Sequence, residues 1–168
     1  MRTALGTAMI VAVIATTTAT TAWAAETAAD RFVGDLVATC ALSTTVKQVR
    51  ANLSNRFVPE NKTAATDIPK ALKPFLGEPT AEKKDGYVAV RVPIKATVKG
   101  LKVLRVNFTI GVENGIDAQV VTFAAPLDAV EQKLGDGVRK IRAKGAEGLE
   151  VLLEPEGDTT DYVCDHSM

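Results

Sequence analysis

The sequence predicts an α+β fold: N-terminal helices packed on a three-stranded antiparallel meander, then a helix and a C-terminal β-hairpin, with one disulfide. Three observations lead to this fold. Apolar residues recur at helical spacing in residues 28–76 and again after residue 126. Between residues 85 and 125 they alternate with a period of two, as in half-buried strands. The 168-residue chain also has only 2 cysteines, Cys40 and Cys164.

Residues 1–24 have the pattern of a secretory signal peptide. Arg2 is the only charged residue before Glu26, an apolar run covers residues 8–15, and Ala22-Trp23-Ala24 forms a small-x-small cleavage site. A retained membrane anchor would need about 20 predominantly apolar residues, and the threonine-rich stretch 16–21 ends the run too early. We therefore expect a cleaved leader, residues 1–24, and one exported domain, residues 25–168, with no stable membrane anchor.

The two cysteines have a default role in an exported chain, because an oxidising compartment lets them pair. Neither cysteine belongs to a C-x-x-C motif, the usual sign of a redox-active pair. We therefore expect a structural disulfide between Cys40 and Cys164. In the chain-entropy model a cross-link that closes so long a loop contributes up to about 5 kcal/mol, and more commonly about 2–4 kcal/mol. Leader and disulfide together predict a periplasmic or secreted protein.

Three helical segments are expected before the strands. Ser43, Thr44 and Thr45 offer N-caps for the second segment. Asp67 begins the third and shortest, with Pro69 tolerated in its first turn. Apolar residues mark the buried faces: Phe32, Val33, Leu36, Val37 and Cys40 in the first segment, Val46, Val49 and Leu53 in the second, and Ile68, Leu72, Phe75 and Leu76 in the third.

The three strands of the meander are expected to expose their odd positions and bury their even ones. A two-residue turn at Lys99-Gly100 would place apolar residues opposite charged ones, whereas a three-residue loop, 98–100, sets Val90 opposite Phe108. The same reasoning favours the loop 113–115 for the second hairpin, which sets Phe108 opposite Val120. Pro93 cannot donate to a sheet hydrogen bond, so the first strand is expected at an edge.

The C-terminal third predicts a helix and a hairpin. Pro126 can open the helix, and the stretch Gly135-Asp136-Gly137 is expected to bend or break it. Residues 149–153 and 162–164 then predict two strands around a turn at residues 155–158. The buried face of the helix follows from helical spacing: Leu127, Val130, Leu134, Val138 and Ile141.

The outer face of the predicted meander has more apolar residues than a solvated surface needs. Val103, Val121 and Phe123 fall on it, with Arg105 opposite Phe123. One interpretation is a binding patch for a partner or ligand, with a cation–π contact from Arg105. The other, which we favour, is that a helix or the C-terminal hairpin covers these residues. Arg91 and Lys95 on the same face keep the first interpretation open.

The sequence contains no catalytic, cofactor or metal-binding signature. His166 is the only histidine, and Asp161, Asp165 and Ser167 lie near it, which suggests a triad or a metal site. Chain ends are usually mobile, and a triad needs a fixed geometry, so we expect a solvated tail instead. The aspartates of residues 158–165 do not have the spacing of a calcium loop. The basic cluster at residues 139–144 is expected to be a solvated helix face.

These observations predict a small, exported, non-enzymatic binding protein that takes an apolar or lipid-like ligand. Helices over an antiparallel sheet commonly leave an apolar cleft with a few polar groups at its mouth. The alternative is a protein–protein module, such as an inhibitor or accessory subunit of an extracytoplasmic enzyme. Nucleic acid is not expected as a partner, because the formal net charge is +0 and such binding needs clustered cations. No cofactor is expected.

Overall fold

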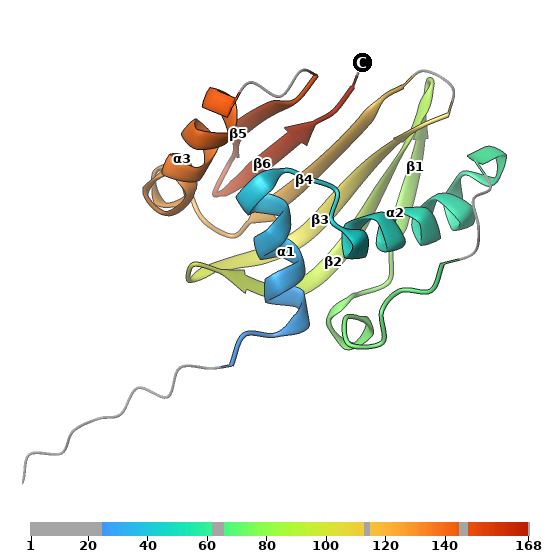
Figure 1. Ribbon diagram of the computed structural model, residues 1–168, viewed down its shortest axis with the longest axis horizontal. Coiled ribbons are helices and arrows are strands. Elements are labelled where there is room, and N and C mark those ends of the chain that lie inside the picture. The colour runs from blue at the N-terminus through green and yellow to red at the C-terminus, as the bar shows by residue number, and fades with distance from the viewer. Residues whose placement is uncertain (1–24, 62–65, 113–114, 145–147, 168) are drawn as a thin grey trace, which may run out of the picture.

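The computed structural model describes residues 25–61, 66–112, 115–144 and 148–167. In these residues, three α-helices pack on one six-stranded antiparallel sheet (Figure 1), so the predicted α+β fold is confirmed. The predicted leader, residues 1–24, and part of the predicted 113–115 loop lie outside the described residues. The helices are α1 (Ala28–Thr39), α2 (Thr44–Phe57) and α3 (Leu127–Lys144). The strands are β1 (Thr80–Lys84), β2 (Tyr87–Val98), β3 (Leu101–Gly111), β4 (Asp117–Phe123), β5 (Glu150–Glu156) and β6 (Thr159–Asp165).

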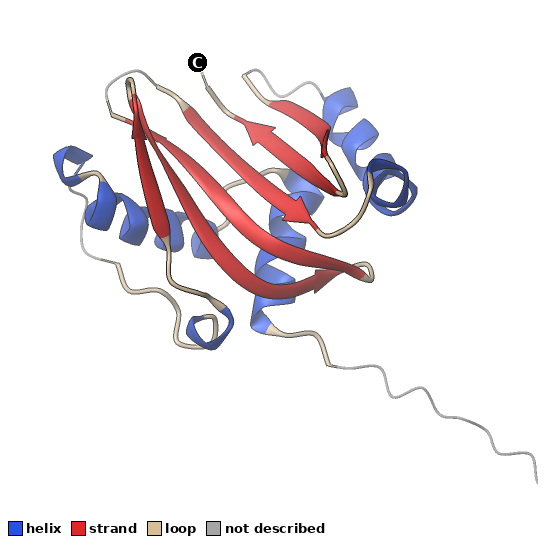
Figure 2. Ribbon diagram, turned by 180° about the vertical axis from the view of Figure 1, so that it is seen from behind, coloured by secondary structure: helices blue, strands red, loops and turns tan. Residues whose placement is uncertain are grey.

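The meander and the C-terminal hairpin form one continuous sheet with the strand order β1-β2-β3-β4-β6-β5. The last strand, β6, returns to lie between β4 and β5, so both edges of the sheet, β1 and β5, are short strands. α1 and α2 cross one face of the sheet and α3 lies along β5, while the opposite face, turned toward the viewer in Figure 2, carries no helix. We call this opposite face the bare face.

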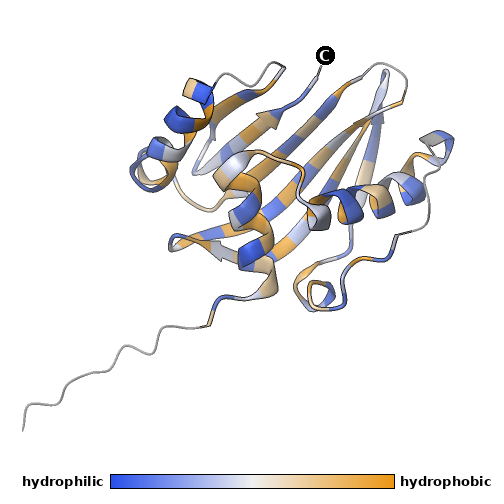
Figure 3. Cartoon of the chain, in the orientation of Figure 1, coloured by the Kyte–Doolittle hydropathy of each residue, from blue (hydrophilic) through white to orange (hydrophobic). Residues whose placement is uncertain are grey.

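The core lies between the helices and the sheet and contains the apolar residues that the helical and strand periods predict. Phe32, Leu36, Val46 and Leu53 of the helices are at most 4% exposed. Figure 3 shows the corresponding alternation of hydrophobic and hydrophilic residues along the strands. The two periods therefore identified the layers correctly, because each element buries only one of its faces.

Capping fixes where the first two helices begin. Thr27 and Asp30 form a capping box at the start of α1, in which each side chain accepts a hydrogen bond from the backbone of the other residue. Ser43 caps α2 by accepting from the N–H of Val46, as predicted. The cap at Thr27 was not predicted.

The expected third helix near Asp67 is wrong. The chain forms a turn and one short 3₁₀ helix there, η2 (Lys73–Phe75), although Leu72 is buried as expected. An earlier 3₁₀ helix, η1 (Pro59–Asn61), follows α2. The reason is local. Proline lacks the N–H that an α-helix needs and disfavours helical backbone in the residue before it, and Pro74 stands in the middle of the expected helix.

The first hairpin has the predicted register far from its turn, but its turn differs. Val90 lies opposite Phe108, as predicted, whereas Val98 pairs with Leu101, so the turn has two residues, Lys99-Gly100. Both have positive φ, 48° and 79°, which is the backbone of a type I′ turn. The extra residue expected in the turn lies instead in an irregularity of the ladder between Pro93 and Ala96.

In the second hairpin the observed register differs from the predicted one by one residue. Phe108 pairs with Gln119 instead of Val120, and Val106 pairs with Val121. The register also shifts between Val103 and Arg105 of β3. A one-residue shift moves every side chain of a strand to the other face. The odd positions of β4 therefore point into the core.

The β1 edge of the sheet is built mainly from polar residues. β1 was not predicted, and all five of its residues are exposed, three of them charged. It pairs with residues 87–91 of β2, so β2 is an edge strand only beyond that point, where Pro93 lies. Charged, short edges of this kind oppose edge-to-edge pairing with other chains.

The C-terminal elements follow the sequence with one difference. α3 runs through Gly135 and Gly137 without a break, so of the predicted bend or break the break does not occur. The hairpin of β5 and β6 is present, and Pro155 belongs to β5 instead of to the turn. This position suits proline, because β5 is an edge strand.

Candidate functional site

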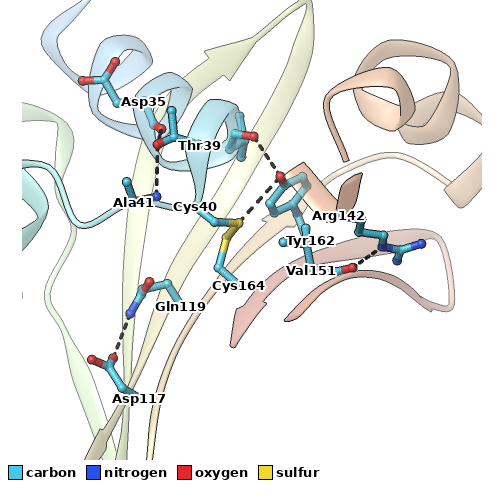
Figure 4. The surroundings of a disulfide bond; sticks show 11 residues. Asp35, Thr39, Cys40, Ala41, Asp117, Gln119, Arg142, Val151, Tyr162 and Cys164 are labelled. Carbon is cyan, nitrogen blue, oxygen red and sulfur yellow. Dashed lines mark hydrogen bonds between the residues drawn. A yellow bond between two sulfur atoms is a disulfide. The ribbon is translucent and has the colours of Figure 1, made fainter. Parts of the chain in front are cut away.

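The predicted disulfide between Cys40 and Cys164 is present and joins the end of α1 to β6 (Figure 4). The two Cα atoms are 5.6 Å apart, and both residues are at most 1% exposed. Cys40 is the C-cap of α1 and has φ 50°, a left-handed backbone that non-glycine residues seldom adopt. A buried disulfide in this place holds the helix against the sheet and is typical of a protein in a non-reducing environment.

Tyr162 strengthens the same end of α1. Its hydroxyl donates a hydrogen bond of 2.8 Å to the carbonyl oxygen of Val37 (Figure 4), one of the final carbonyls of a helix that lack a partner within it. Tyr162 is 0% exposed. Burial raises its pKa to about 12, although the charge of Arg142 acts in the opposite direction. Covalent, hydrogen-bonded and apolar contacts thus meet here, and we call Val37, Cys40, Tyr162 and Cys164 the disulfide end.

The predicted patch of Val103, Arg105, Val121 and Phe123 does not exist as an exposed surface. Val103 is 1% exposed, and Val121 and Phe123 are both 0% exposed. The register shifts in β3 and β4 turn these three side chains toward the helices. They are core residues, which agrees with the interpretation of a covered face, although the cover is the helical layer itself.

Arg105 remains on the bare face, away from Phe123. Its guanidinium forms a salt bridge of 3.1 Å with Glu156 at the end of β5. The Nε atom of Arg105 and the Oδ1 atom of the nearby Asn107 are both buried and have no hydrogen-bond partner among the described residues. The structure therefore gives Arg105 an ion pair instead of the predicted cation–π contact.

The end of the chain is held to the sheet, so the expected solvated tail is wrong for the described residues up to Ser167. The N–H of His166 donates to the carbonyl of Asp117 at 2.7 Å, and the hydroxyl of Ser167 accepts from the N–H of Asp117 at 3.2 Å. Asp117 also accepts from Gln119 at 2.8 Å and pairs with Arg50 of α2 at 3.0 Å. These contacts tie α2 and the tail to β4.

The basic cluster of α3 and the acidic C-terminal stretch have structural contacts. Arg142 donates to the carbonyl of Val151 at 2.6 Å, and Arg139 pairs with Asp136 one turn away on the same helix. Asp161 accepts from Thr122 at 2.6 Å on the bare face. Within residues 25–61, 66–112, 115–144 and 148–167, no group of His, Cys, Asp and Glu side chains is arranged to hold a metal ion.

An open groove of about 1020 Å³ lies between α1, α3 and the tip of the β2–β3 hairpin. Its floor is the core side of the two strands, including Ala96, Val98 and Val103. One wall is a single stripe of α1, formed by Asp30, Gly34, Val37 and Ala38, and the other wall includes Leu134 and Gly137 of α3. Of the four patch residues predicted from the sequence, only Val103 lines this groove.

Two helical glycines leave the groove empty. A Cβ atom added at Gly34 or at Gly137 would meet no other atom within 4 Å, and both positions lie inside helices. Glycine in a helix interior costs about 1 kcal/mol relative to alanine. Both glycines line the walls of the groove, so a larger side chain at either position would project into it.

Polar contacts hold the rim of the groove. Asp30 accepts a hydrogen bond of 2.6 Å from the N–H of Thr97 in β2, and Lys99 at the hairpin tip donates to the carbonyl of Lys133 in α3 at 3.1 Å. Figure 1 shows the hairpin tip between these two helices. Partial desolvation works against ionisation of Asp30, but the hydrogen bonds from Thr27 and Thr97 outweigh it and lower the pKa of this carboxyl.

The groove has the composition of a site for an apolar compound. Its floor and walls are mostly apolar, with Thr27 and Thr97 as uncharged polar residues, and its charged groups lie at the rim: Glu26, Asp30, Lys95, Lys99 and Lys102. Ligand sites are commonly concave, mostly apolar and supplied with a few polar groups that orient the ligand. We call the groove and its rim the groove end of the molecule.

Sequence reasoning anticipated a cleft between helices and sheet but not its residues. Gly34 and Gly137 belong to segments far apart in the chain, and no local pattern shows that they face each other. Their position inside helical patterns was the available signal, because an interior glycine that costs stability commonly has a packing or functional reason.

Comparisons with known proteins add no assignment: the chain matches no family model, no curated protein and no solved structure. In the part of the chain with described structure, no helix has the length and apolar character needed to cross a membrane.

Proposed function

We propose that this protein is an exported, periplasmic or secreted, binding protein that holds an apolar, lipid-like ligand in the groove between α1, α3 and the β2–β3 hairpin. The observation that carries the proposal is the groove itself. It measures about 1020 Å³ and is lined mainly by apolar residues. Two helical glycines, Gly34 and Gly137, keep its walls free of side chains.

The architecture around the groove supports a binding role. The disulfide and Tyr162 fix α1 at one end, while the hairpin tip is attached to α1 and α3 by two polar contacts. A site held on rigid elements loses little entropy when a ligand binds, which favours affinity.

Export rests on the leader pattern of residues 1–24 and is supported by the buried disulfide, which persists in oxidising compartments and is rare in reducing ones. Protein isolated from the native host should therefore begin near Ala25 and contain no free thiol. Intact mass before and after reduction measures both properties.

The binding test uses palmitic acid and its uncharged methyl ester as probes. We expect at least one of them to raise the melting temperature of the mature protein, because a ligand that binds only the folded state stabilises it. Native mass spectrometry should show a one-to-one complex. Preference for the acid would assign a role to the lysines at the rim, and equal binding would assign the affinity to the apolar walls.

A groove-filling variant locates the site. Gly34→Leu places a side chain in the empty space beside α1, so the variant should lose binding while its melting temperature stays unchanged or rises by about 2–4 °C, since leucine is the better helix former. Asp35→Leu, which adds the same side chain at the exposed neighbouring position outside the groove, is the matched control and should bind normally. Undiminished binding by Gly34→Leu would refute the groove as the site.

A further inference from the structure

Charges of opposite sign occupy the two halves of the bare face. Pairing of the strands places side chains of β2 and β3 on one half and those of β5 and β6 on the other. The β2–β3 half carries cations: Arg91 and Arg105, and at the hairpin tip Lys95 and Lys102, which also line the rim of the groove. The β5–β6 half carries carboxylates: Glu150, Glu154, Glu156, Asp161 and Asp165.

Most of these carboxylates form no salt bridge with a cation of the described residues. Of the five, only Glu156 forms a salt bridge with a described residue, and its partner is Arg105. Four carboxylates on one half of a sheet face repel one another, and an external positive surface would relieve that repulsion. On the cationic half, Arg91 pairs with Glu82 of β1 at 3.4 Å and Arg105 pairs with Glu156, whereas neither Lys95 nor Lys102 forms a salt bridge with a described residue.

An apolar row runs from β4 across the β5–β6 half, between its carboxylates. The register places Val120, Val163 and Leu152 in one row across β4, β6 and β5, and all three are only half-buried. Asn107, the next residue along this row, has a buried Oδ1 atom without a partner among the described residues. An apolar centre flanked by charge is the composition of a protein–protein interface with a polar rim.

From this arrangement we infer that the bare face binds a second copy of this chain, face to face, about a two-fold axis parallel to the strands and close to β4. In a two-fold interface the same surface serves both copies, so it must be complementary to itself. An axis parallel to the strands turns the acidic half of each copy onto the cationic half of the other. Val120 then lies near the axis, opposite its own equivalent.

The charge pattern excludes the other two-fold arrangement of the same faces. An axis that runs across the strands would place β5 and β6 of one copy on β5 and β6 of the other, so carboxylates would face carboxylates. Like charges brought together in an interface cost several kcal/mol. Association along the sheet edges is opposed by the charged residues of β1 and by the shortness of β1 and β5.

The test uses two charge reversals in the mature, oxidised protein, with mass measured by analytical ultracentrifugation. Wild type should be a dimer at micromolar concentration that dissociates as ionic strength rises. Arg91→Glu and Glu154→Lys should each weaken self-association by about 100-fold or more, since each change acts twice in a two-fold interface. Mixed together, the two variants should form a heterodimer, because one contact then joins the two reversed charges and the other joins the unchanged Arg91 and Glu154, so both contacts are attractive.

Charge reversals in the helical layer are the matched controls. Asp35→Lys on α1 and Lys140→Glu on α3 change exposed positions away from the bare face and should leave the dimer intact. Circular dichroism establishes that each variant is folded, and Glu154→Gln with Arg91→Gln replace any that is not. A monomeric wild type, a dimer indifferent to both reversals, or a mixture without heterodimer would each overturn the inference. Capture of a different protein by a monomeric wild type would identify another partner for this face.

Discussion

The two ends of α1 are held to the sheet in different ways. At the disulfide end, a covalent bond, a buried hydroxyl and apolar contacts hold the helix, and Cys40, Tyr162 and Cys164 are at most 1% exposed. At the groove end, Ala29, Phe32 and Val33 are buried as well, but the side-chain hydrogen bond to β2 comes from one carboxylate, Asp30, and the side of α1 that lines the groove has only a glycine at position 34. The difference shows how a small domain can concentrate its stability at one end of a helix and keep an open site beside the other.

Of the changes at the two ends of α1, removal of the disulfide should lower the stability of the protein most. Cys40→Ala combined with Cys164→Ala is expected to lower the free energy of unfolding by about 2–4 kcal/mol, because the unfolded chain regains the entropy of a long closed loop. Urea denaturation of the oxidised wild type and the double variant measures the loss. A loss below about 1 kcal/mol would show that other contacts hold the disulfide end.

Tyr162→Phe should have the next largest effect. Without the hydroxyl, the buried carbonyl of Val37 loses its hydrogen bond, which costs about 1–3 kcal/mol. The only other tyrosine, Tyr87, is half-buried, and Tyr87→Phe is the matched control, with an expected change within about 0.5 kcal/mol. Equal effects of the two substitutions would show that the Tyr162 hydroxyl does not stabilise the disulfide end.

Alkaline pH tests the same residue independently. The pKa of Tyr162 is raised from 10.0 to about 12 in the folded protein, so folding keeps a proton that the unfolded chain releases. Its contribution is complete below pH 10 and is lost as the pH rises toward 12. The stability of wild type should therefore fall more steeply across this window than that of Tyr162→Phe. Parallel curves would contradict burial of the hydroxyl.

Asp30→Asn should have the smallest effect and should act at the groove end. The amide weakens the capping box and the contact with Thr97, at an expected cost of about 0.5–1 kcal/mol. Because the pKa of Asp30 is lowered on folding, its contribution is present above the ordinary aspartate pKa and is lost as the pH falls through the folded value. The melting temperatures of wild type and variant should converge in acid. A difference in melting temperature that stays constant into acid would contradict this role of the Asp30 carboxylate.

Much of the disulfide end could be predicted from the sequence. Helical and strand periods identified the buried residues of α1, β2 and α3, and the cysteine count identified the bond. The register of β4 could not be predicted, because Val120 and Val121 are adjacent and both apolar, so either parity fits the pattern of alternation. The irregularity near Leu104 of β3 has the same cause, since Val103 and Leu104 are equally suited to burial.

The groove end could not be predicted from the sequence, for a different physical reason. A groove consists of absent side chains, and Gly34 and Gly137 become neighbours of one site only through the packing of α1 and α3 on the sheet. The turn at Lys99-Gly100 depends in the same way on tertiary contacts, because Lys99 adopts a left-handed backbone while its ammonium group reaches α3. Local propensity would have favoured asparagine or glycine at that position.

Amide hydrogen exchange with and without palmitic acid tests the difference between the two ends most directly. We predict that the ligand slows amide exchange at Thr97 and in the neighbouring residues of the hairpin and α1. Cys40 and β6 should exchange equally slowly in the free and the ligand-bound protein. Unchanged exchange at the hairpin in a complex shown by mass to be loaded, or protection that appears only on the bare face, would contradict it.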